Sequence, residues 1–304
     1  MQFNRSDKYI IQSYLANGSS GNVFLVYHRE ENKNYVLKMI EFNDETERKM
    51  IEKEIEIFSQ LKHENIISFK ESWCQDKNIS IIMEYAEKGD LNSYIKSRRG
   101  KLIHESEIKS LFRQIVEGIK YLHNLNIIHR DIKSLNIFLT SKNEIKLGDF
   151  GLSKRVSGLS EELNSIIGTP IYFPPEMIVE QKYTMKMDIW ALGIVLYELM
   201  SLTYPFNDAF IIKLFKKISQ NNPPPLPKIY SKILTDLCSN LLNKNPILRP
   251  TIMEINNHPF LNPGKRIVRS RSKSPISYRE RSFSPLVVRK VKLFTRNSRC
   301  VSPI

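Results

Sequence analysis

The sequence predicts an α+β protein with two lobes, a small strand-rich lobe with one main helix followed by a larger, mostly helical lobe. In the first 100 residues, short apolar runs with strand-like spacing surround one amphipathic helical pattern. Beyond them, apolar residues recur every three or four positions as far as residue 261, as in helices. The chain has 304 residues, of which 41% are hydrophobic and 26% are charged, so each lobe can bury a core of its own.

The strand-rich lobe is expected over residues 9–83. Residues 9–28 are typical of two strands joined by a turn of Gly, Ser and Asn. Residues 34–40 and 78–86 have the apolar and β-branched composition of further strands. These segments together predict a small sheet.

Two helices follow from the spacing of apolar residues. Residues 45–63 carry Ile51, Ile55 and Phe58 at spacings of four and three between charged residues, which predicts an amphipathic helix. A second helix is predicted over residues 106–125. Its apolar face would comprise Ile108, Leu111, Phe112, Ile115, Ile119 and Leu122.

Cysteine usage and hydropathy favour a cytoplasmic protein. Cys74, Cys238 and Cys300 are far apart and odd in number, without the spacing of a disulfide framework or a zinc site. The first ten residues have no apolar core of the signal-peptide type. The most apolar segment, residues 189–202, contains Glu198 and is too short to span a bilayer, so a buried helix is expected there.

The remaining parts of the chain are an N-terminal extension (residues 1–8), a connecting segment (84–90), the helical lobe (91–261) and a tail (262–304). The tail carries 12 Lys plus Arg and one Glu, so +11 of the net charge of +14 belongs to it. It is rich in Ser and Arg, repeats Ser-Pro three times, and is expected to be largely disordered.

One stretch, residues 127–139 (IIHRDIKSLNIFL), places six polar side chains between two apolar runs. They are His129, Arg130, Asp131, Lys133, Ser134 and Asn136. Burying such groups without partners costs roughly 1–3 kcal/mol each, so they should either satisfy one another or face a ligand. Asp149 follows in the sequence GDFG, thirteen residues after Asn136. Two carboxylates and a carboxamide are oxygen ligands of the kind that Mg²⁺ prefers, and a nearby lysine can neutralise a phosphoryl group.

The order His-Arg-Asp-x-Lys-x-x-Asn followed by Asp-Phe-Gly resembles the signature of the protein kinase family. The resemblance implies the two-lobed protein kinase fold. It implies that Asp131 is the base that orients the acceptor hydroxyl and that Lys133 contacts the γ-phosphate. It further implies that Asn136 and Asp149 hold the Mg²⁺ ions, or Mn²⁺ in their place, that accompany ATP. A chance polar loop would be the favoured alternative for a His-Arg-Asp triplet without the rest of the pattern.

The segment Leu15–Val23 (LANGSSGNV) resembles the glycine-rich loop that covers the phosphates of ATP. Ala16 stands where the family pattern has a glycine. The candidate nucleotide contacts in this loop are Leu15, Gly18, Ser19, Ser20, Gly21 and Val23. By itself this loop would more simply be a plain hairpin turn.

Lys38, at the end of the sequence YVLK, matches the lysine that holds the α- and β-phosphates in protein kinases. By the same resemblance its partner would be Glu54, on the helix predicted over residues 45–63. Lys38 and Glu54 would then join Asp131 and Lys133 as catalytic residues. Taken singly, such a lysine usually snorkels to solvent and such a glutamate is usually solvated.

Residues 81–91 (IIMEYAEKGDL) resemble the hinge segment of a kinase. Met83 would be the gatekeeper, the backbone of Glu84 and Ala86 would bind adenine, and Asp90 would reach the ribose. Each apolar side chain in this set would otherwise be read as plain core. The residues expected to enclose the base are Val23, Val36 and Phe138.

Residues 168–176 (GTPIYFPPE) resemble the segment that shapes the acceptor-peptide site. Glu176 is expected to pair with Arg249 as a buried structural tie, and Asp188 is expected to brace the catalytic loop. The presence of Lys133 and of the Gly-Thr-Pro sequence favours a serine/threonine kinase over a tyrosine kinase.

The NIMA-related kinases are the subfamily that residues 9–261 resemble, through Asn-Ile-Phe-Leu, Leu-Gly-Asp-Phe-Gly, and Met-Glu-Tyr followed by Gly-Asp-Leu. This resemblance implies an activation loop over residues 151–174. Ser165, four residues before Thr169, would be phosphorylated there and its phosphate would lie near Arg130. An ordinary loop serine is the alternative for Ser165.

The leading hypothesis is therefore a Mg-ATP-dependent serine/threonine protein kinase with protein substrates. Relatives suggest roles in the cell cycle, at microtubules or at the cilium, with a cytoskeletal or ciliary location. One alternative is a pseudokinase scaffold that binds nucleotide without turnover, which the presence of Lys38, Asp131 and Asp149 disfavours. Another is a small-molecule phosphotransferase, which the peptide-site segment disfavours. The tail would bind an acidic partner such as tubulin or nucleic acid, or else be a solvated linker with Ser-Pro phosphorylation sites.

Overall fold

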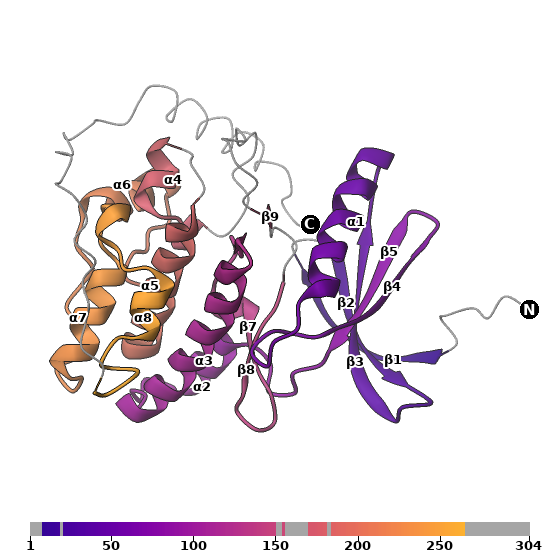
Figure 1. Cartoon of the computed structure of the whole chain (residues 1–304), viewed down its shortest axis with the longest axis horizontal. Coiled ribbons are helices and arrows are strands. Elements are labelled where there is room, and N and C mark those ends of the chain that lie inside the picture. Colours follow the sequence, from indigo (N-terminus) through magenta and orange to yellow (C-terminus); the bar gives the residue numbers. More distant parts are fainter. Residues whose placement is uncertain (1–7, 19–20, 150–153, 156–169, 181–183, 265–304) are drawn as a thin grey trace, which may run out of the picture. The chain divides into compact units, whose positions relative to one another are not determined.

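The computed structural model describes residues 8–18, 21–149, 154–155, 170–180 and 184–264 (Figure 1). The chain divides into two compact units. Unit 1 comprises residues 1–94 and 117–155, and unit 2 comprises residues 95–116 and 156–304.

The lobe boundary expected at residues 84–90 stays a prediction. Backbone hydrogen bonds join Leu147 to residues 65–67. The Ile67 N–H donates to the Leu147 carbonyl at 2.8 Å, and the Leu147 N–H donates to the Asn65 carbonyl at 2.8 Å. Residues 127–149 therefore belong to the same compact unit as the N-terminal sheet.

Unit 1 contains a five-stranded antiparallel sheet with the strand order β1-β2-β3-β5-β4. Its strands are β1 (Tyr9–Gly18), β2 (Gly21–His28), β3 (Lys33–Glu41), β4 (Phe69–Gln75) and β5 (Asn78–Glu84). The prediction of β1, β2, β3 and β5 is confirmed. Strand β4, FKESWCQ, was not predicted, because an edge strand with one neighbour needs few apolar side chains.

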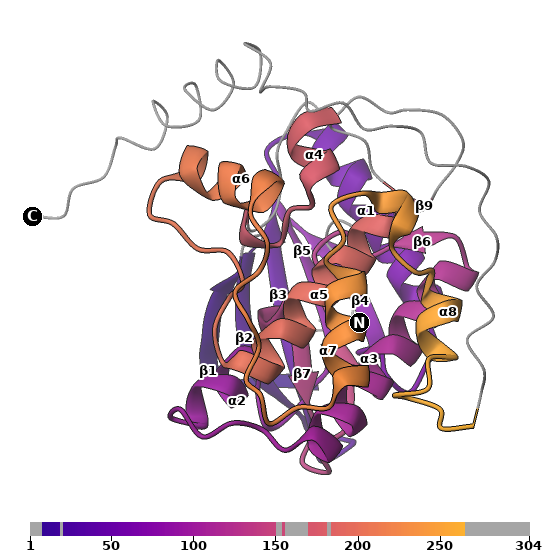
Figure 2. The ribbon, with the colours of Figure 1, turned by 90° about the vertical axis from the view of Figure 1, so that its left-hand side faces the viewer.

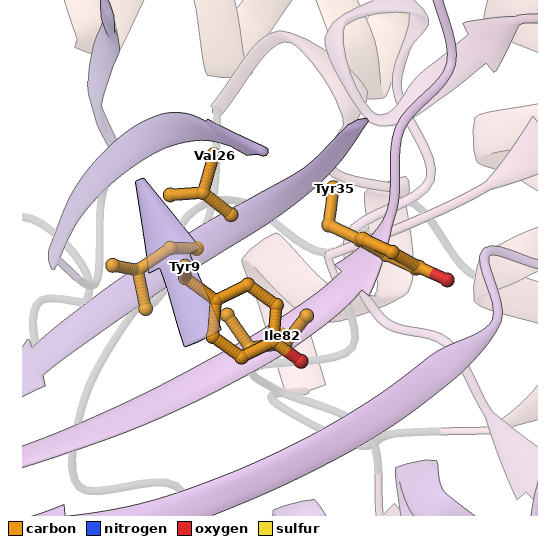
Figure 3. Packing of buried hydrophobic residues seen from close by; sticks show 5 residues of the cluster. Tyr9, Val26, Tyr35 and Ile82 are labelled. Atoms are coloured by element: carbon orange, nitrogen blue, oxygen red, sulfur yellow. The ribbon is translucent and has the colours of Figure 1, made fainter. Parts of the chain in front are cut away.

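The alternation of side chains along β3 decides which of them face the candidate site. Tyr35 and Leu37 join a buried cluster with Tyr9, Val26 and Ile82 on one face of the sheet (Figure 3). Successive side chains of a strand point to opposite faces, so Val36 and Lys38 point to the other face. This arrangement separates a purely structural core from the face that carries Lys38.

Helix α1 (Glu45–Gln60) begins at Asp44, whose side chain caps it by accepting from the Glu47 N–H at 2.8 Å. The helix ends three residues before the predicted end at residue 63. Phe58, on its buried face, packs edge-to-face against Phe69 of β4 with ring centroids 5.6 Å apart. The expected amphipathic helix is therefore confirmed, and it packs on the edge of the sheet.

The rest of unit 1 consists of short elements that present the polar residues of the catalytic loop. Strand β6 (Ile127–Ile128) pairs with β9 (Lys154–Arg155), and β7 (Ile137–Leu139) pairs with β8 (Ile145–Leu147). A single-turn 3-10 helix, Ser134–Asn136, precedes β7. Helices α2 (Leu91–Ser97) and α3 (Glu105–Asn124) each contribute residues to both units.

Helix α3 buries the whole apolar face that the sequence predicts, from Ile108 to Leu122. Near its C-terminal end, Gly118 permits a close approach to β8. A Cβ atom at Gly118 would lie 2.7 Å from Leu147 Cδ1 and 3.1 Å from the Asn65 carbonyl oxygen. The glycine therefore lets β8 lie directly against the helix.

Unit 2 is helical. Its helices are α4 (Pro175–Glu180), α5 (Met185–Ser201), α6 (Ile211–Gln220), α7 (Lys232–Leu241) and α8 (Ile252–Asn256). Helix α5 is buried from Met187 to Met200, which confirms the predicted buried helix, and it lies beside α7 (Figure 2). Among the described residues, no helix is both long and apolar enough to cross a bilayer.

Candidate active site

The catalytic loop is tied to Gly148, the residue before Asp149, by a fully buried histidine. His129 Nε2 lies 3.1 Å from the Gly148 carbonyl oxygen, and the Asp131 N–H donates to His129 Nδ1 at 3.4 Å. Together these contacts fit a ring that carries its proton on Nε2. His129 thus connects the loop that carries Asp131 with the segment that carries Asp149.

Asp131, Lys133 and Asn136 satisfy one another. Asp131 Oδ2 accepts from Lys133 Nζ at 2.7 Å and from Asn136 Nδ2 at 2.8 Å. Asn136 Nδ2 also donates to the Asp131 backbone carbonyl at 2.9 Å. All three residues are buried, and their mutual hydrogen bonds offset much of the free-energy cost of burying these polar groups.

Lys38 and Asp149, which are 111 residues apart in sequence, form an ion pair between Lys38 Nζ and Asp149 Oδ1 at 2.7 Å. Burial raises the pKa of the Asp149 carboxyl, but the positive charges of Lys38 and Lys133 and the hydrogen bond from Lys38 outweigh it. The pKa of Asp149 therefore lies below its usual value. Asp149 is an anion at neutral pH, as a metal ligand must be.

The expected Lys38–Glu54 pair stays a prediction. Glu54 is half-buried on α1, and Lys38 forms an ion pair with Asp149. Lys38 lies across the ladder from Val23 and Ile81, so its backbone position is fixed by both neighbouring strands.

The glycine-rich segment forms the hairpin between β1 and β2, with Gly18 paired to Gly21 and Ala16 paired to Val23. Gly21 has φ +134°, and a Cβ atom there would lie 2.0 Å from the Met39 carbonyl oxygen, so only glycine fits. The exposed Leu15 lies on β1. Ser19 and Ser20 lie outside the described residues.

The predicted adenine-site residues fall on β2, β3, β5 and β7 and in the segment that follows β5. Val36 is the register partner of Met83, Glu84 ends β5, and Ala86 lies two residues beyond it. Phe138 lies against Gly148, where a Cβ atom would be 2.8 Å from Phe138 Cε2. Glycine at this position therefore leaves room for the aromatic ring expected beneath the base.

Asp90 has a structural role that the sequence did not suggest. Its carboxylate accepts from the Ser93 N–H at 2.8 Å and from the Ser93 hydroxyl at 2.9 Å, which caps the start of α2. Its backbone also forms a bridge with Phe138. The predicted contact with ribose stays a prediction beside this capping role.

The residues expected to regulate the site are described only in part. Arg130 directly precedes Asp131 and is in the left-handed region, with φ +70°. Asp149 has φ +57°, so unusual backbone conformations occur at both segments of the candidate site. Ser165 and Thr169 lie outside the described residues.

In unit 2, the predicted tie between Glu176 and Arg249 is confirmed. Arg249 Nη1 and Nη2 donate to the two carboxylate oxygens of Glu176 at 2.6 and 2.7 Å, and the arginine side chain is 0% exposed. Asp188 is buried in the first turn of α5, and its contact with the catalytic loop stays a prediction. Tyr172, which donates to Glu198 at 2.5 Å, is a further buried pair that sequence reasoning missed.

The donor set suits Mg²⁺. Asn136 uses Nδ2 for both of its bonds to Asp131, so its other side-chain atom, the carbonyl oxygen Oδ1, is left as a ligand oxygen for a metal. Asp149 supplies a carboxylate. Mg²⁺ is typically bound by one or two carboxylates together with phosphates and water. The described residues contain no group of three His, Cys, Asp or Glu that could hold a metal by itself.

The candidate site brings together polar side chains of the catalytic loop, the carboxylate of Asp149 and the lysine Lys38 from β3 of the antiparallel sheet. This is the arrangement of a protein kinase. A family model described as "Protein kinase domain" matches residues 9–261, and the chain belongs to this family.

The sequence is similar to several Nek kinases, which confirms the resemblance to the NIMA-related group. Serine/threonine-protein kinase Nek4 of Mus musculus is 38% identical over 256 residues, 83% of this chain and 32% of the relative. A probable serine/threonine-protein kinase, nek3 of Dictyostelium discoideum, is 40% identical over 84% of this chain and 24% of its own length. Serine/threonine-protein kinase Nek3 of Mus musculus is 38% identical over 81% of this chain and 48% of its own length. The chain thus spans less than half the length of these relatives.

Proposed function

We propose that the chain is a serine/threonine protein kinase that transfers the γ-phosphate of Mg-ATP to hydroxyl groups of protein substrates. The observation that carries this proposal is the set of contacts in unit 1. Asp131 is held by Lys133 and Asn136, while Asp149 is held as an anion by Lys38. The protein kinase family match supports the same activity.

Positioning and charge stabilisation are the main tasks of such a site, since phosphoryl transfer requires little covalent chemistry from the protein. Asp131 would accept the hydrogen bond of the acceptor hydroxyl and orient it for in-line attack. Lys133, bonded to the same carboxylate, would stabilise negative charge on the transferring phosphoryl group. Bound Mg²⁺ would neutralise phosphate charge, with Asn136 and Asp149 as its protein ligands and Mn²⁺ as a substitute.

The contact between Lys38 and Asp149 suggests how the nucleotide would reorganise the site. Both groups are charged and directly paired in this structure. ATP phosphates would offer Lys38 a second anionic partner, while the metal would offer Asp149 a second cationic one. The pair would therefore loosen as each group turns to its own ligand.

Serine and threonine are the proposed acceptors. Lys133, two residues after Asp131, and the sequence Gly-Thr-Pro at 168–170 are typical of serine/threonine kinases. The relatives carry the same designation in their names. Activation by phosphate on Ser165 or Thr169, received by Arg130, belongs to this proposal.

The tail and the location of the protein are a separate part of the proposal. The net charge of +11 over residues 262–304 supports binding to an acidic partner, such as tubulin or nucleic acid. A cytoplasmic protein associated with microtubules or a cilium would follow from tubulin binding. Pelleting with microtubules that weakens as salt is raised would support this part, and no pelleting at low salt would contradict it.

The activity test compares the wild-type chain with Lys38→Met and Asp149→Ala in phosphate transfer to a protein substrate. Both variants should lose at least about 100-fold in rate, because Lys38→Met removes a cation proposed to bind the phosphates and Asp149→Ala removes a proposed metal ligand. Lys49→Met, an exposed change on α1, is the matched control and should keep wild-type activity. Wild-type activity equal to that of both variants would contradict the proposal, and nucleotide binding without transfer would indicate a pseudokinase.

A further inference from the structure

Lys146 and Glu84 form an ion pair between two segments of the candidate nucleotide site. Lys146 Nζ lies 2.8 Å from Glu84 Oε1, and the two side chains are only 12% and 21% exposed. Glu84 ends β5 and begins the hinge segment, and Lys146 is the middle residue of β8. At this degree of burial the pair is weakly screened by salt, unlike the exposed pairs of the molecule.

The Glu84 side chain is held at both of its oxygens. Its Oε2 accepts from the Ser68 N–H at 3.0 Å, while the Glu84 N–H donates to the Ser68 carbonyl at 2.9 Å. This pair of bonds with one residue limits the rotamers of Glu84 and presents Oε1 to Lys146. The carboxylate is therefore a fixed anchor at the start of the hinge segment.

Lys146 is equally well placed on its own segment. Its neighbours Ile145 and Leu147 are buried on the opposite face of β8, so the lysine cannot turn away without exposing them. Across the ladder it faces Phe138, and three residues later the chain reaches Asp149. A displacement of Lys146 is therefore expected to change the positions of Phe138, across the ladder, and of Asp149, three residues further along the chain.

Other hydrogen bonds join the same two segments as the ion pair. In the backbone, the Lys88 N–H donates to the Leu139 carbonyl and the Leu139 N–H donates to the Gly89 carbonyl, each at 2.9 Å. Glu87 accepts from the Ser141 N–H at 2.8 Å. These three hydrogen bonds and the ion pair therefore join the hinge segment to the β7–β8 hairpin.

We infer that Glu84 and Lys146 are positioning residues that hold the adenine-binding backbone in register with the metal ligands Asn136 and Asp149. The inference rests on the proposed function, because the adenine and metal contacts belong to it. ATP touches both segments at once, so its affinity depends on their relative placement as well as on each contact. Removing the ion pair should therefore reduce the enhancement of ATP affinity by Mg²⁺ more than it reduces the affinity for adenosine.

The experiment measures dissociation constants of adenosine, ATP and Mg-ATP for the full chain by calorimetry. The main variant is Glu84→Gln with Lys146→Met, which removes both charges and leaves neither buried alone. Lys146→Arg keeps the charge and tests rescue. The matched control is Glu31→Gln with Lys70→Met, which removes an ion pair beside the same sheet whose side chains are 38% and 34% exposed.

In the wild type, Mg²⁺ should strengthen ATP binding, and the double variant should lose about tenfold of that enhancement while adenosine affinity changes less than about twofold. Lys146→Arg should recover most of the enhancement, and the control should match the wild type. The inference is overturned if a folded double variant keeps the full enhancement, or if adenosine and Mg-ATP lose affinity by the same factor.

The outcomes separate the inference from the proposed function. A wild-type chain that binds neither adenosine nor Mg-ATP would overturn both. A wild-type chain that binds Mg-ATP, beside a variant with undiminished enhancement, would overturn the inference alone. If circular dichroism shows that the double variant does not fold, Glu84→Gln with Lys146→Gln, which also removes both charges, takes its place with the same expected and contradicting results.

Discussion

Asn136 holds Asp131 through a single amide group, whose Nδ2 donates to the Asp131 carboxylate at 2.8 Å and to its backbone carbonyl at 2.9 Å. Asn136→Ala should therefore displace the proposed base as well as remove a proposed metal ligand. We expect kcat to fall by about 100-fold or more, since small displacements of a catalytic group have effects of this size. Steady-state transfer to a protein substrate measures it. Asn240→Ala, an exposed change on α7, is the control, and a kcat of Asn136→Ala within threefold of that control would contradict the prediction.

Arg249 and Glu176 should matter for stability more than for chemistry. Glu176→Ala leaves the guanidinium of a fully buried arginine without its carboxylate, which should lower the free energy of unfolding by about 3–5 kcal/mol. Urea denaturation measures this change. Asp236→Asn removes the partner of the exposed Lys232 and should cost less than about 1 kcal/mol. Equal losses for the two variants would show that the buried pair has no special role.

The lowered pKa of the half-buried Lys244 should make the free energy of unfolding depend on pH above neutrality. Burial, helped by the charge of Arg249, lowers the pKa of Lys244 to about 7, whereas the unfolded chain keeps its usual value near 10.4. Between these values the unfolded chain binds the extra proton, so the free energy of unfolding rises with pH. The faces of Trp190 and Phe206, 5.0 and 4.1 Å from Nζ, favour the ammonium form and reduce the effect.

The measurement for Lys244 compares the wild type with Lys244→Met by urea denaturation at pH 7, 8 and 9. The wild type should gain roughly 1–3 kcal/mol relative to the variant over this range. Lys213→Met is the control, because Lys213 lies over the ring of the exposed Phe210. A difference that stays constant with pH, or that falls, would contradict the prediction.

Gly148 should be essential for the placement of Phe138. In Gly148→Ala, the new Cβ would lie 2.8 Å from Phe138 Cε2, so the ring must shift. We expect the KM for ATP to rise several-fold and the free energy of unfolding to fall by about 1–3 kcal/mol. Adding Phe138→Leu should relieve the clash and recover part of the stability. A Gly148→Ala variant with wild-type stability and KM would show that the ring moves freely.

Much of the fold could be predicted from the sequence because it depends on local patterns. The spacing of apolar residues predicted α1 and α3 with their buried faces, a continuous apolar run predicted α5, and composition predicted four strands of the sheet. Strand β4 was not predicted, because its position at the edge of the sheet allows a polar sequence. The pairing of Glu176 with Arg249 was also foreseen, through the family resemblance.

Other parts of the candidate site depend on contacts between segments far apart in the chain. No local pattern shows that Lys38 pairs with Asp149, that Asp90 caps α2, or that Lys146 reaches Glu84. An isolated lysine or glutamate is most often solvated, so its partner becomes visible only when the distant segment is in place.

The sequence by itself determined the identity and order of the candidate reactive groups, because the proposed phosphoryl transfer needs those side chains at those spacings. Only the tertiary structure decided which oppositely charged groups meet, since an ion pair forms where burial and backbone register bring two charges within a few ångströms. For Asp149 these two contributions combine, as the sequence supplies the carboxylate and the fold supplies the cation of Lys38 that keeps it ionised.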